Sequence, residues 1–249
     1  MDHPALDGAV ALVTEASSVL GAATARRLAL EGAAVSLVAP ASDRLAVLAE
    51  QILSSGGHAV AIEQDITDRE QAYGAVQQTL DRFGRLDILV NNAEVRVVSS
   101  ALHSTLHEWD RMVALNLTAL LHVTHAAVPY LIDAATTSPR QVADLVNLGS
   151  TAGRVARPGT SVYSLTKSGV VGFSESLRQE LVSEGVRVSV VDPGPLGNEL
   201  LDQWGAAAAA GARRPSEPEQ PGHARTVADA IVYIVTREPG EAVDQILLS

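Results

Sequence analysis

The 249-residue chain contains no cysteine. This absence excludes disulfide bonds, thiolate catalysis and zinc sites with cysteine ligands, and it fits the reducing environment of the cytoplasm. The first ten residues, MDHPALDGAV, have neither a basic flank nor an apolar core, so we expect no signal peptide. No uncharged apolar run has the length of a membrane span. The sequence therefore predicts a cytoplasmic protein.

Basic and aromatic residues are also scarce. The chain has 18 Lys and Arg residues and 29 Asp and Glu residues, which gives a net charge of −11, and it contains no basic run. We therefore expect no nucleic-acid partner. Aromatic residues make up 3% of the chain, which leaves Ala, Val, Leu and Ile to build the core. With 47% hydrophobic residues, a chain of this length suits one α/β domain.

The only lysine, Lys167, lies four residues after Tyr163, so on a helix the two side chains share one face. A nearby ammonium favours the phenolate form of tyrosine, whose hydroxyl has a pKa of about 10 in water, and helps it exchange a proton nearer neutral pH. Ser150 follows an apolar run, where its hydroxyl could hold a substrate oxygen. Tyrosine and lysine at this spacing are common on helix surfaces. The placement of the single lysine nevertheless favours chemistry, because the planar fork of arginine does not replace a compact ammonium.

Short apolar runs alternate with helical patterns along the chain, which predicts right-handed βαβ crossovers and a parallel sheet. We expect strands at 9–14, 34–39, 58–63, 86–91, 143–148, 187–192 and 245–248, and helices at 21–32, 43–54, 68–83, 110–134, 161–184 and 226–236, the last capped by Thr226. Residues 1–249 would form a single domain. Within it, residues 193–225, rich in Pro, Gly and Ala, would form a mobile segment that covers the substrate.

A series of short motifs runs along the chain, namely Asp65, Asn91-Asn92-Ala93, Asn116, Ser150, Tyr163 with Lys167, and Pro193-Gly194. In order and spacing, this series resembles the short-chain dehydrogenase/reductase family over nearly the whole length. The runs VYSLTKSGVVGFSESLRQEL and GVRVSVVDPG are most similar to its branch of aldehyde reductases and 3-hydroxy acid dehydrogenases that includes clavaldehyde reductase. The resemblance implies an α/β Rossmann-type fold, a doubly wound parallel seven-stranded sheet flanked by helices. It also implies hydride transfer between NADP(H) or NAD(H) and a small carbonyl or hydroxy substrate.

The resemblance further assigns roles to individual residues. Tyr163 would be the general acid and base, Lys167 would lower its pKa and hold the nicotinamide ribose, Ser150 would orient the substrate oxygen, and Asn116 would hold a water that relays protons to Lys167. The residues that would contact the cofactor are Thr14, Ser17, Gly21, Asp65, Asn92, Ala93, Tyr163, Lys167, Pro193 and Gly194. For Asp65, a turn or helix cap before Thr67 is an equally good interpretation. The family packs two long helices, here around 110–134 and 161–184, against a neighbour, which implies a homodimer or homotetramer.

Two glycine motifs depart from the family pattern. In the first strand-to-helix turn, Glu15 and Val19 replace two of three glycines, and Gly21 alone remains; after the fourth strand, Glu94 replaces another. A carboxylate about 4 Å from a phosphate would repel it by ~1 kcal/mol in water and ~4 kcal/mol at an effective dielectric of 20. We therefore expect weak cofactor binding. The second strand ends in Ala39-Pro40, so the sequence does not decide whether the cofactor is NADP or NAD.

Three functions remain open from the sequence. The first is the oxidoreductase, the second an enzyme of the same fold that performs elimination, cyclisation or isomerisation without nicotinamide, and the third a non-catalytic subunit. The pairs His103/His107 and His122/His125 have a spacing that could bind a metal ion but lack a third ligand, so we expect no metal site.

Overall fold

The computed structural model describes residues 4–194, 214–215 and 221–248. Its strands are β1 (Val10–Thr14), β2 (Ala34–Ala39), β3 (His58–Glu63), β4 (Ile88–Asn91), β5 (Val97–Val98), β6 (Ala143–Leu148), β7 (Val186–Pro193), β8 (Arg214–Pro215) and β9 (Gln245–Leu248). Its α-helices are α1 (Val19–Leu30), α2 (Asp43–Ser54), α3 (Arg69–Phe83), α4 (Leu106–Val113), α5 (Leu120–Thr137), α6 (Ser161–Leu181) and α8 (Pro221–Val235). A π-helical segment, η1 (Ala114–Ala119), joins α4 to α5, and two short 3-10 helices are η2 (Thr151–Gly153) and η3 (Val182–Glu184).

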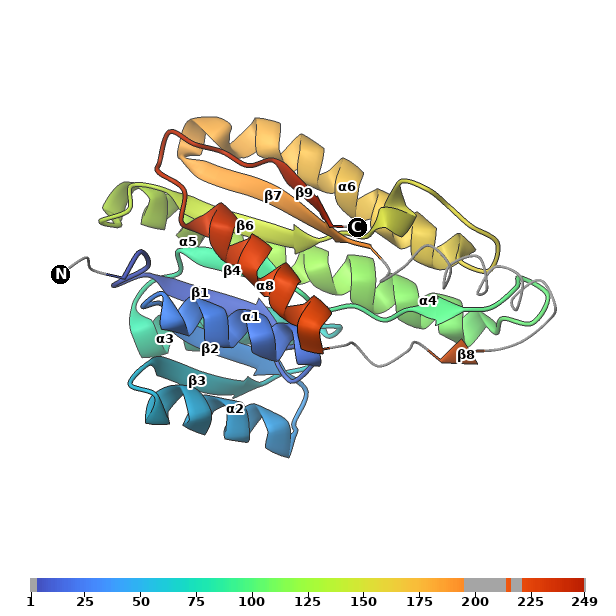
Figure 1. Cartoon of the computed structure of the whole chain (residues 1–249), viewed down its shortest axis with the longest axis horizontal. Helices are drawn as coiled ribbons and strands as arrows, with labels where there is room; N and C mark the ends of the chain where they lie inside the picture. Colours follow the sequence, from blue (N-terminus) through green and yellow to red (C-terminus); the bar gives the residue numbers. More distant parts are fainter. Residues whose placement is uncertain (1–3, 195–213, 216–220, 249) are drawn as a thin grey trace.

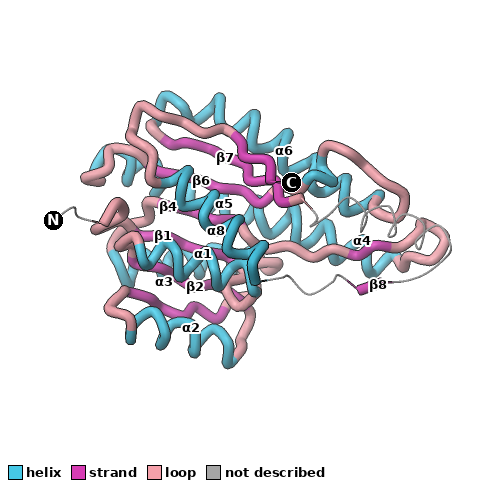
Figure 2. The backbone as a smooth tube through the Cα atoms, in the orientation of Figure 1, coloured by secondary structure: helices cyan, strands magenta, loops and turns pink. Residues whose placement is uncertain are grey.

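Seven strands form one parallel sheet in the order β3-β2-β1-β4-β6-β7-β9, which Figure 2 shows in magenta with helices on both sides. The strand order reverses between β1 and β4, as in a doubly wound Rossmann sheet. The expected fold class is confirmed. In sheets of this kind, ligands bind beyond the carboxyl ends of the strands at the reversal, so this edge is where a site is expected.

Two apolar layers cover the two faces of the sheet. One contains buried residues of α1, α2 and α8, and the other contains buried residues of α3, α5 and the end of α6. Figure 1 shows α8, the red helix, lying beside α1 although the two are far apart in the sequence. The central strands β1, β4 and β6 are buried along their whole length, as expected for strands covered on both faces.

Three helices begin earlier than the sequence pattern predicted. The helix expected from Gly21 begins at Val19, after the cap at Ser18. The helix expected from residue 110 begins at Leu106, where Thr105 and Glu108 form a capping box. The helix expected from Thr226 begins at Pro221, because proline is favoured in a first helical turn, where its missing N–H would have no partner. Thr226 is therefore not a cap, and its hydroxyl donates to the carbonyl of Gly222 one turn earlier.

The segment expected to cover the substrate, 193–225, lies mostly outside the described residues. Its described parts are the end of β7, the short strand β8, which pairs antiparallel with β5, and the first turn of α8. Mobility of this segment and a single domain over 1–249 both stay predictions. By length and composition alone, one helical stretch among the described residues, Leu106–Thr137, could cross a membrane, and 44% of its most apolar window is buried within the fold.

Candidate active site

Side chains from β1 and β4 meet at the point where the strand order reverses. The Thr14 hydroxyl accepts hydrogen bonds from the backbone N–H groups of Asn92 and Ala93, at 2.9 and 3.0 Å. The Asn92 amide in turn donates to the Thr14 carbonyl at 2.9 Å. These bonds fix the two turns that leave the sheet, so three residues expected to contact a cofactor lie together at the predicted edge.

The turn after β1 keeps the shape of a phosphate loop although two glycines are replaced. A Cβ on Gly21 would lie 2.3 Å from the Glu15 carbonyl oxygen and 2.8 Å from the Asn92 amide nitrogen, so only glycine fits there. Ser18 caps α1 by accepting from the Gly21 N–H at 2.9 Å. Val19 is the first residue of α1 and is 42% exposed, so its side chain is not part of the core. Ser17 lies partly exposed in the same turn.

Glu15 takes the place of a glycine in conformation as well as in sequence. Its φ of 51° lies in the left-handed region that favours glycine. Burial, and after it the charge of Asp65, raise the pKa of the Glu15 carboxyl above its ordinary value, while Arg111 acts in the opposite direction. The carboxyl group expected to face cofactor phosphates therefore holds its proton more readily than an ordinary glutamate.

Ser150, Tyr163 and Lys167 come together from the end of β6 and the first turns of α6. All three are buried, with Lys167 only 1% exposed. The Lys167 ammonium donates to the Leu148 carbonyl at 2.8 Å and lies 5.8 Å from the centre of the Tyr163 ring. Gly153 allows this packing, since a Cβ there would lie 2.8 Å from the backbone of Lys167. The helical spacing of tyrosine and lysine thus builds the shared face that the sequence predicted.

Glu94, from the turn after β4, completes this cluster. Its carboxylate lies 2.5 Å from the Lys167 ammonium and accepts a hydrogen bond from the Tyr163 hydroxyl at 3.2 Å. The sequence marked Glu94 as a replaced glycine and, in the alternative without nicotinamide, as a possible acid–base group. Its reach to both residues was missed, because no local pattern reports a contact across 69 residues.

The charges around Tyr163 oppose its ionisation. Burial and then the charge of Glu94 raise its pKa well above the ordinary value, while Arg96 and a hydrogen bond with Ser150 act to lower it. Burial is the largest influence on the Glu94 carboxyl and acts to raise its pKa, but the Lys167 ammonium, Arg96 and the Tyr163 hydroxyl together outweigh burial and lower the pKa. In this state Tyr163 is a protonated donor beside an ion pair.

Asn116 lies in the π-helical segment η1 and is buried. Its amide oxygen accepts from the Val95 N–H at 2.8 Å, and its amide nitrogen donates to the Val95 carbonyl at 2.9 Å and to the Thr166 hydroxyl at 3.1 Å. The side chain therefore ties the turn that carries Glu94 to the helix that carries Lys167. A water relay through Asn116 stays a prediction.

The remaining predicted residues lie around this edge. The Asp65 carboxylate accepts from the Thr67 N–H at 3.0 Å and from its hydroxyl at 2.6 Å, the geometry of the turn that was the alternative interpretation. Pro193 ends β7, and Gly194 follows it.

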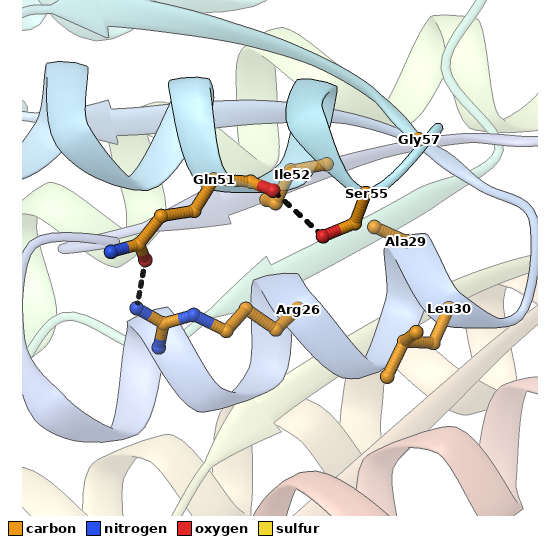
Figure 3. A pocket seen from close by; sticks show the side chains of 7 residues that line it. All are labelled: Arg26, Ala29, Leu30, Gln51, Ile52, Ser55 and Gly57. Atoms are coloured by element: carbon orange, nitrogen blue, oxygen red, sulfur yellow. Dashed lines mark hydrogen bonds between the residues drawn. The ribbon is translucent and has the colours of Figure 1, made fainter.

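A pocket between α1 and α2 lies at the opposite edge of the sheet, since two of its lining residues, Ala29 and Gly57, shortly precede strands (Figure 3). Among the described residues, no group of three acidic or histidine side chains could hold a metal ion.

Comparison with known proteins identifies the family. The family model described as short chain dehydrogenase matches residues 9–208, most of the chain. The chain belongs to the short chain dehydrogenase family. Its members are NAD(P)-dependent oxidoreductases, so the prediction of an oxidoreductase of this family is confirmed. The two alternatives, an enzyme that works without nicotinamide and a non-catalytic subunit, are not favoured. The particular branch suggested by the sequence stays a prediction.

Individual members of the short chain dehydrogenase family match most of the chain. A 3-oxoacyl-[acyl-carrier-protein] reductase of Synechocystis is 33% identical over 203 residues, which cover 81% of this chain and 80% of the relative. The structure of a metagenomic short-chain oxidoreductase in complex with NADP has a TM-score of 0.80 and 28% identity, with 98% of both chains covered. A short chain dehydrogenase of Burkholderia cenocepacia in complex with NADP has a TM-score of 0.79 and 29% identity, covering 98% of this chain and 97% of the other.

Proposed function

We propose that this protein transfers hydride between NADP(H) and a small carbonyl or hydroxy substrate. The observation that carries the proposal is the buried cluster of Ser150, Tyr163 and Lys167 beyond the carboxyl end of β6, next to the reversal of strand order. The similar structures in complex with NADP support the choice of cofactor, and the similar 3-oxoacyl reductase supports a carbonyl substrate.

The residues at this edge fit a dinucleotide. The turn before α1 is tight at Gly21, α1 presents its N-terminus there, and the Asn92 amide oxygen is buried without a hydrogen-bond partner among the described residues. The cofactor would supply or accept the hydride. The residues that would hold it are Thr14, Ser17, Gly21, Asp65, Asn92, Ala93, Tyr163, Lys167, Pro193 and Gly194. Binding of the cofactor would be weak, because the Glu15 carboxyl lies in the turn that would hold the phosphates and because Glu94 forms an ion pair with Lys167.

Three side chains would handle the substrate oxygen. The Tyr163 hydroxyl would donate a proton to a carbonyl oxygen during reduction and take one from an alcohol during oxidation. Ser150 would hold the same oxygen by a hydrogen bond, and Lys167 would stabilise the tyrosine when it loses its proton. Asn116 would keep the turn of Glu94 in register with α6 through Val95 and Thr166.

The test is a screen of aldehydes and ketones with NADPH and NADH, followed by a Tyr163→Phe variant. This change removes the ionisable hydroxyl and little volume, so the fold should survive while the rate falls by about a hundred- to ten-thousandfold. Lys167→Arg keeps the charge but alters its shape and should also reduce the rate. An activity that Tyr163→Phe leaves unchanged would refute the proposal.

The partner proposed for this chain is a second copy of itself, in a homodimer or homotetramer built on α5 and α6. We also propose that residues 1–249 form a single domain and that the protein is located in the cytoplasm. Exposed apolar side chains on these two helices, Leu121 at 45% and Leu165 at 61%, support the assembly. Burial of such side chains between subunits would be favourable, since each fully buried leucine contributes about 1.5–3 kcal/mol.

A further inference from the structure

Glu94 stands at a motif position that the family gives to glycine, yet its side chain reaches the centre of the catalytic cluster. The carboxylate contacts the Lys167 ammonium at 2.5 Å and the Tyr163 hydroxyl at 3.2 Å, while the side chain keeps 30% of its surface exposed. Glu94 has no left-handed φ, so a side chain causes no backbone strain there; among the described residues other than glycine, only Glu15 and Gln141 have one. The glutamate therefore sits in this turn without a left-handed backbone conformation.

The backbone holds Glu94 in place from both sides. The N–H of Ala93, before it, donates to the Thr14 hydroxyl at 3.0 Å. Val95, after it, is held at both its N–H and its carbonyl by the Asn116 amide. Because both neighbours are fixed to different parts of the sheet edge, the backbone of Glu94 is held at a position from which its carboxylate reaches Lys167.

The ion pair changes what Lys167 can do for Tyr163. One ammonium N–H is directed to the Leu148 carbonyl and another to Glu94, and the ammonium charge is balanced by the carboxylate. The charged groups that shift the pKa of Tyr163 are Glu94 and Arg96 from the turn after β4, and Ser150 contributes a hydrogen bond. The Lys167 ammonium lies 5.8 Å from the centre of the Tyr163 ring and is paired with Glu94. The positive charge that should favour the phenolate is thus largely cancelled.

We propose that Glu94 is a positioning residue of the active site, which holds Lys167, keeps Tyr163 protonated and competes with any ligand hydroxyl for the lysine ammonium. The inference rests on the proposed use of Tyr163 as a proton donor. It adds a residue that the family motif does not supply, and it predicts that this protein ionises its tyrosine only at high pH until the Glu94–Lys167 pair is broken.

The test measures the ionisation of Tyr163 in the protein without cofactor. The absorbance change of tyrosine ionisation is recorded between pH 7 and pH 12, and the same titration of Tyr163→Phe is subtracted to isolate Tyr163 from Tyr73, Tyr130 and Tyr233. Glu94→Gln keeps the size of the side chain and removes its charge. We expect the pKa of Tyr163 to fall by about one unit or more, since charges about 4 Å apart at an effective dielectric of 20 interact by several times the thermal energy.

Two variants serve as controls. Glu94→Asp retains the charge and should shift the pKa of Tyr163 less than Glu94→Gln does. Glu15→Gln makes the same chemical change at the same edge of the sheet. The charges that act on Glu15 are those of Asp65 and Arg111, and Glu15 is not among the groups that shift the pKa of Tyr163, so the titration should match the wild type. A Tyr163 pKa that is unchanged or raised in Glu94→Gln, or lowered equally by Glu15→Gln, would overturn the inference.

A second measurement separates this inference from the proposed function. NADPH binding is followed by fluorescence, and Glu94→Gln should tighten it by about threefold or more because Lys167 is released. An unchanged NADPH affinity in Glu94→Gln, with binding detectable, would refute the competition for the ammonium. If no variant binds NADPH while the Tyr163 titration shifts as expected, the proposed function fails and the positioning role of Glu94 stands.

Discussion

Replacing Glu15 by glycine should both stabilise the fold and tighten cofactor binding. Glu15 has a φ of 51°, and a residue with a Cβ in the left-handed region costs roughly 1–2 kcal/mol. Glycine relieves this strain but brings more freedom to the unfolded chain, which offsets about 0.5–1 kcal/mol. The net gain of about 0.5–1 kcal/mol corresponds to a rise in melting temperature of roughly 1–4 °C for a domain of this size.

The chain supplies a matched control at Gln141. This residue has a φ of 53°, is exposed, and precedes β6, at the amino edge of the sheet and away from the site. Gln141→Gly should raise the melting temperature by a similar amount and leave NADPH affinity unchanged. The comparison separates relief of backbone strain from removal of a charge.

A third variant, Glu15→Ala, removes the carboxylate but keeps a Cβ at the left-handed position. It should tighten NADPH binding as Glu15→Gly does, without the gain in melting temperature. Melting is followed by circular dichroism, and binding is followed by calorimetry. If Glu15→Gly lowers the melting temperature, or if Glu15→Ala gains as much stability as Glu15→Gly, the strain argument is wrong.

Three further predictions concern the same protein. Glu15→Gly combined with Val19→Gly should tighten NADPH binding at least tenfold, about 1.4 kcal/mol, and an unchanged affinity in calorimetry would contradict the role of this turn. Because the pKa of Glu15 is raised by burial and by Asp65, its negative charge is lost as pH falls through that raised value; NADH affinity should therefore increase as the pH is lowered from neutral, and Glu15→Gln should flatten the dependence. Light scattering at micromolar concentration should give the mass of a dimer or tetramer, and a monomer would contradict the proposed assembly.

The sequence predicts the framework well because the framework depends on local patterns. Apolar runs predicted β2, β3, β6 and β9 with the bounds that the structure has. The early starts of α4 and α8 had signals in the sequence, namely the Thr105–Glu108 capping box and Pro221, that outweigh apolar periodicity in setting a helix end. The spacing of Tyr163 and Lys167 likewise predicted their shared face.

What could not be predicted depends on contacts between distant segments. The sequence places Glu94 beside a cofactor channel but says nothing of whether its side chain turns to solvent or to Lys167. In the structure the carboxylate lies against Lys167, and the Asn116 amide, from another element of the fold, holds the backbone of the next residue, Val95. The π-helical turn that presents Asn116 also leaves no mark in the pattern of apolar residues.

The two glutamates that replace glycines act on opposite ends of the site by different physical means. Glu15 adopts the backbone of the glycine that it replaces, so the turn survives and the penalty is strain and charge. Glu94 costs no strain but takes the only lysine of the chain as its partner. Neither change removes the tight contact at Gly21 or the Ser150–Tyr163–Lys167 cluster. Together they affect the charge near a bound dinucleotide and the protonation of Tyr163, and we predict that one substitution at each glutamate changes the corresponding property without altering the fold.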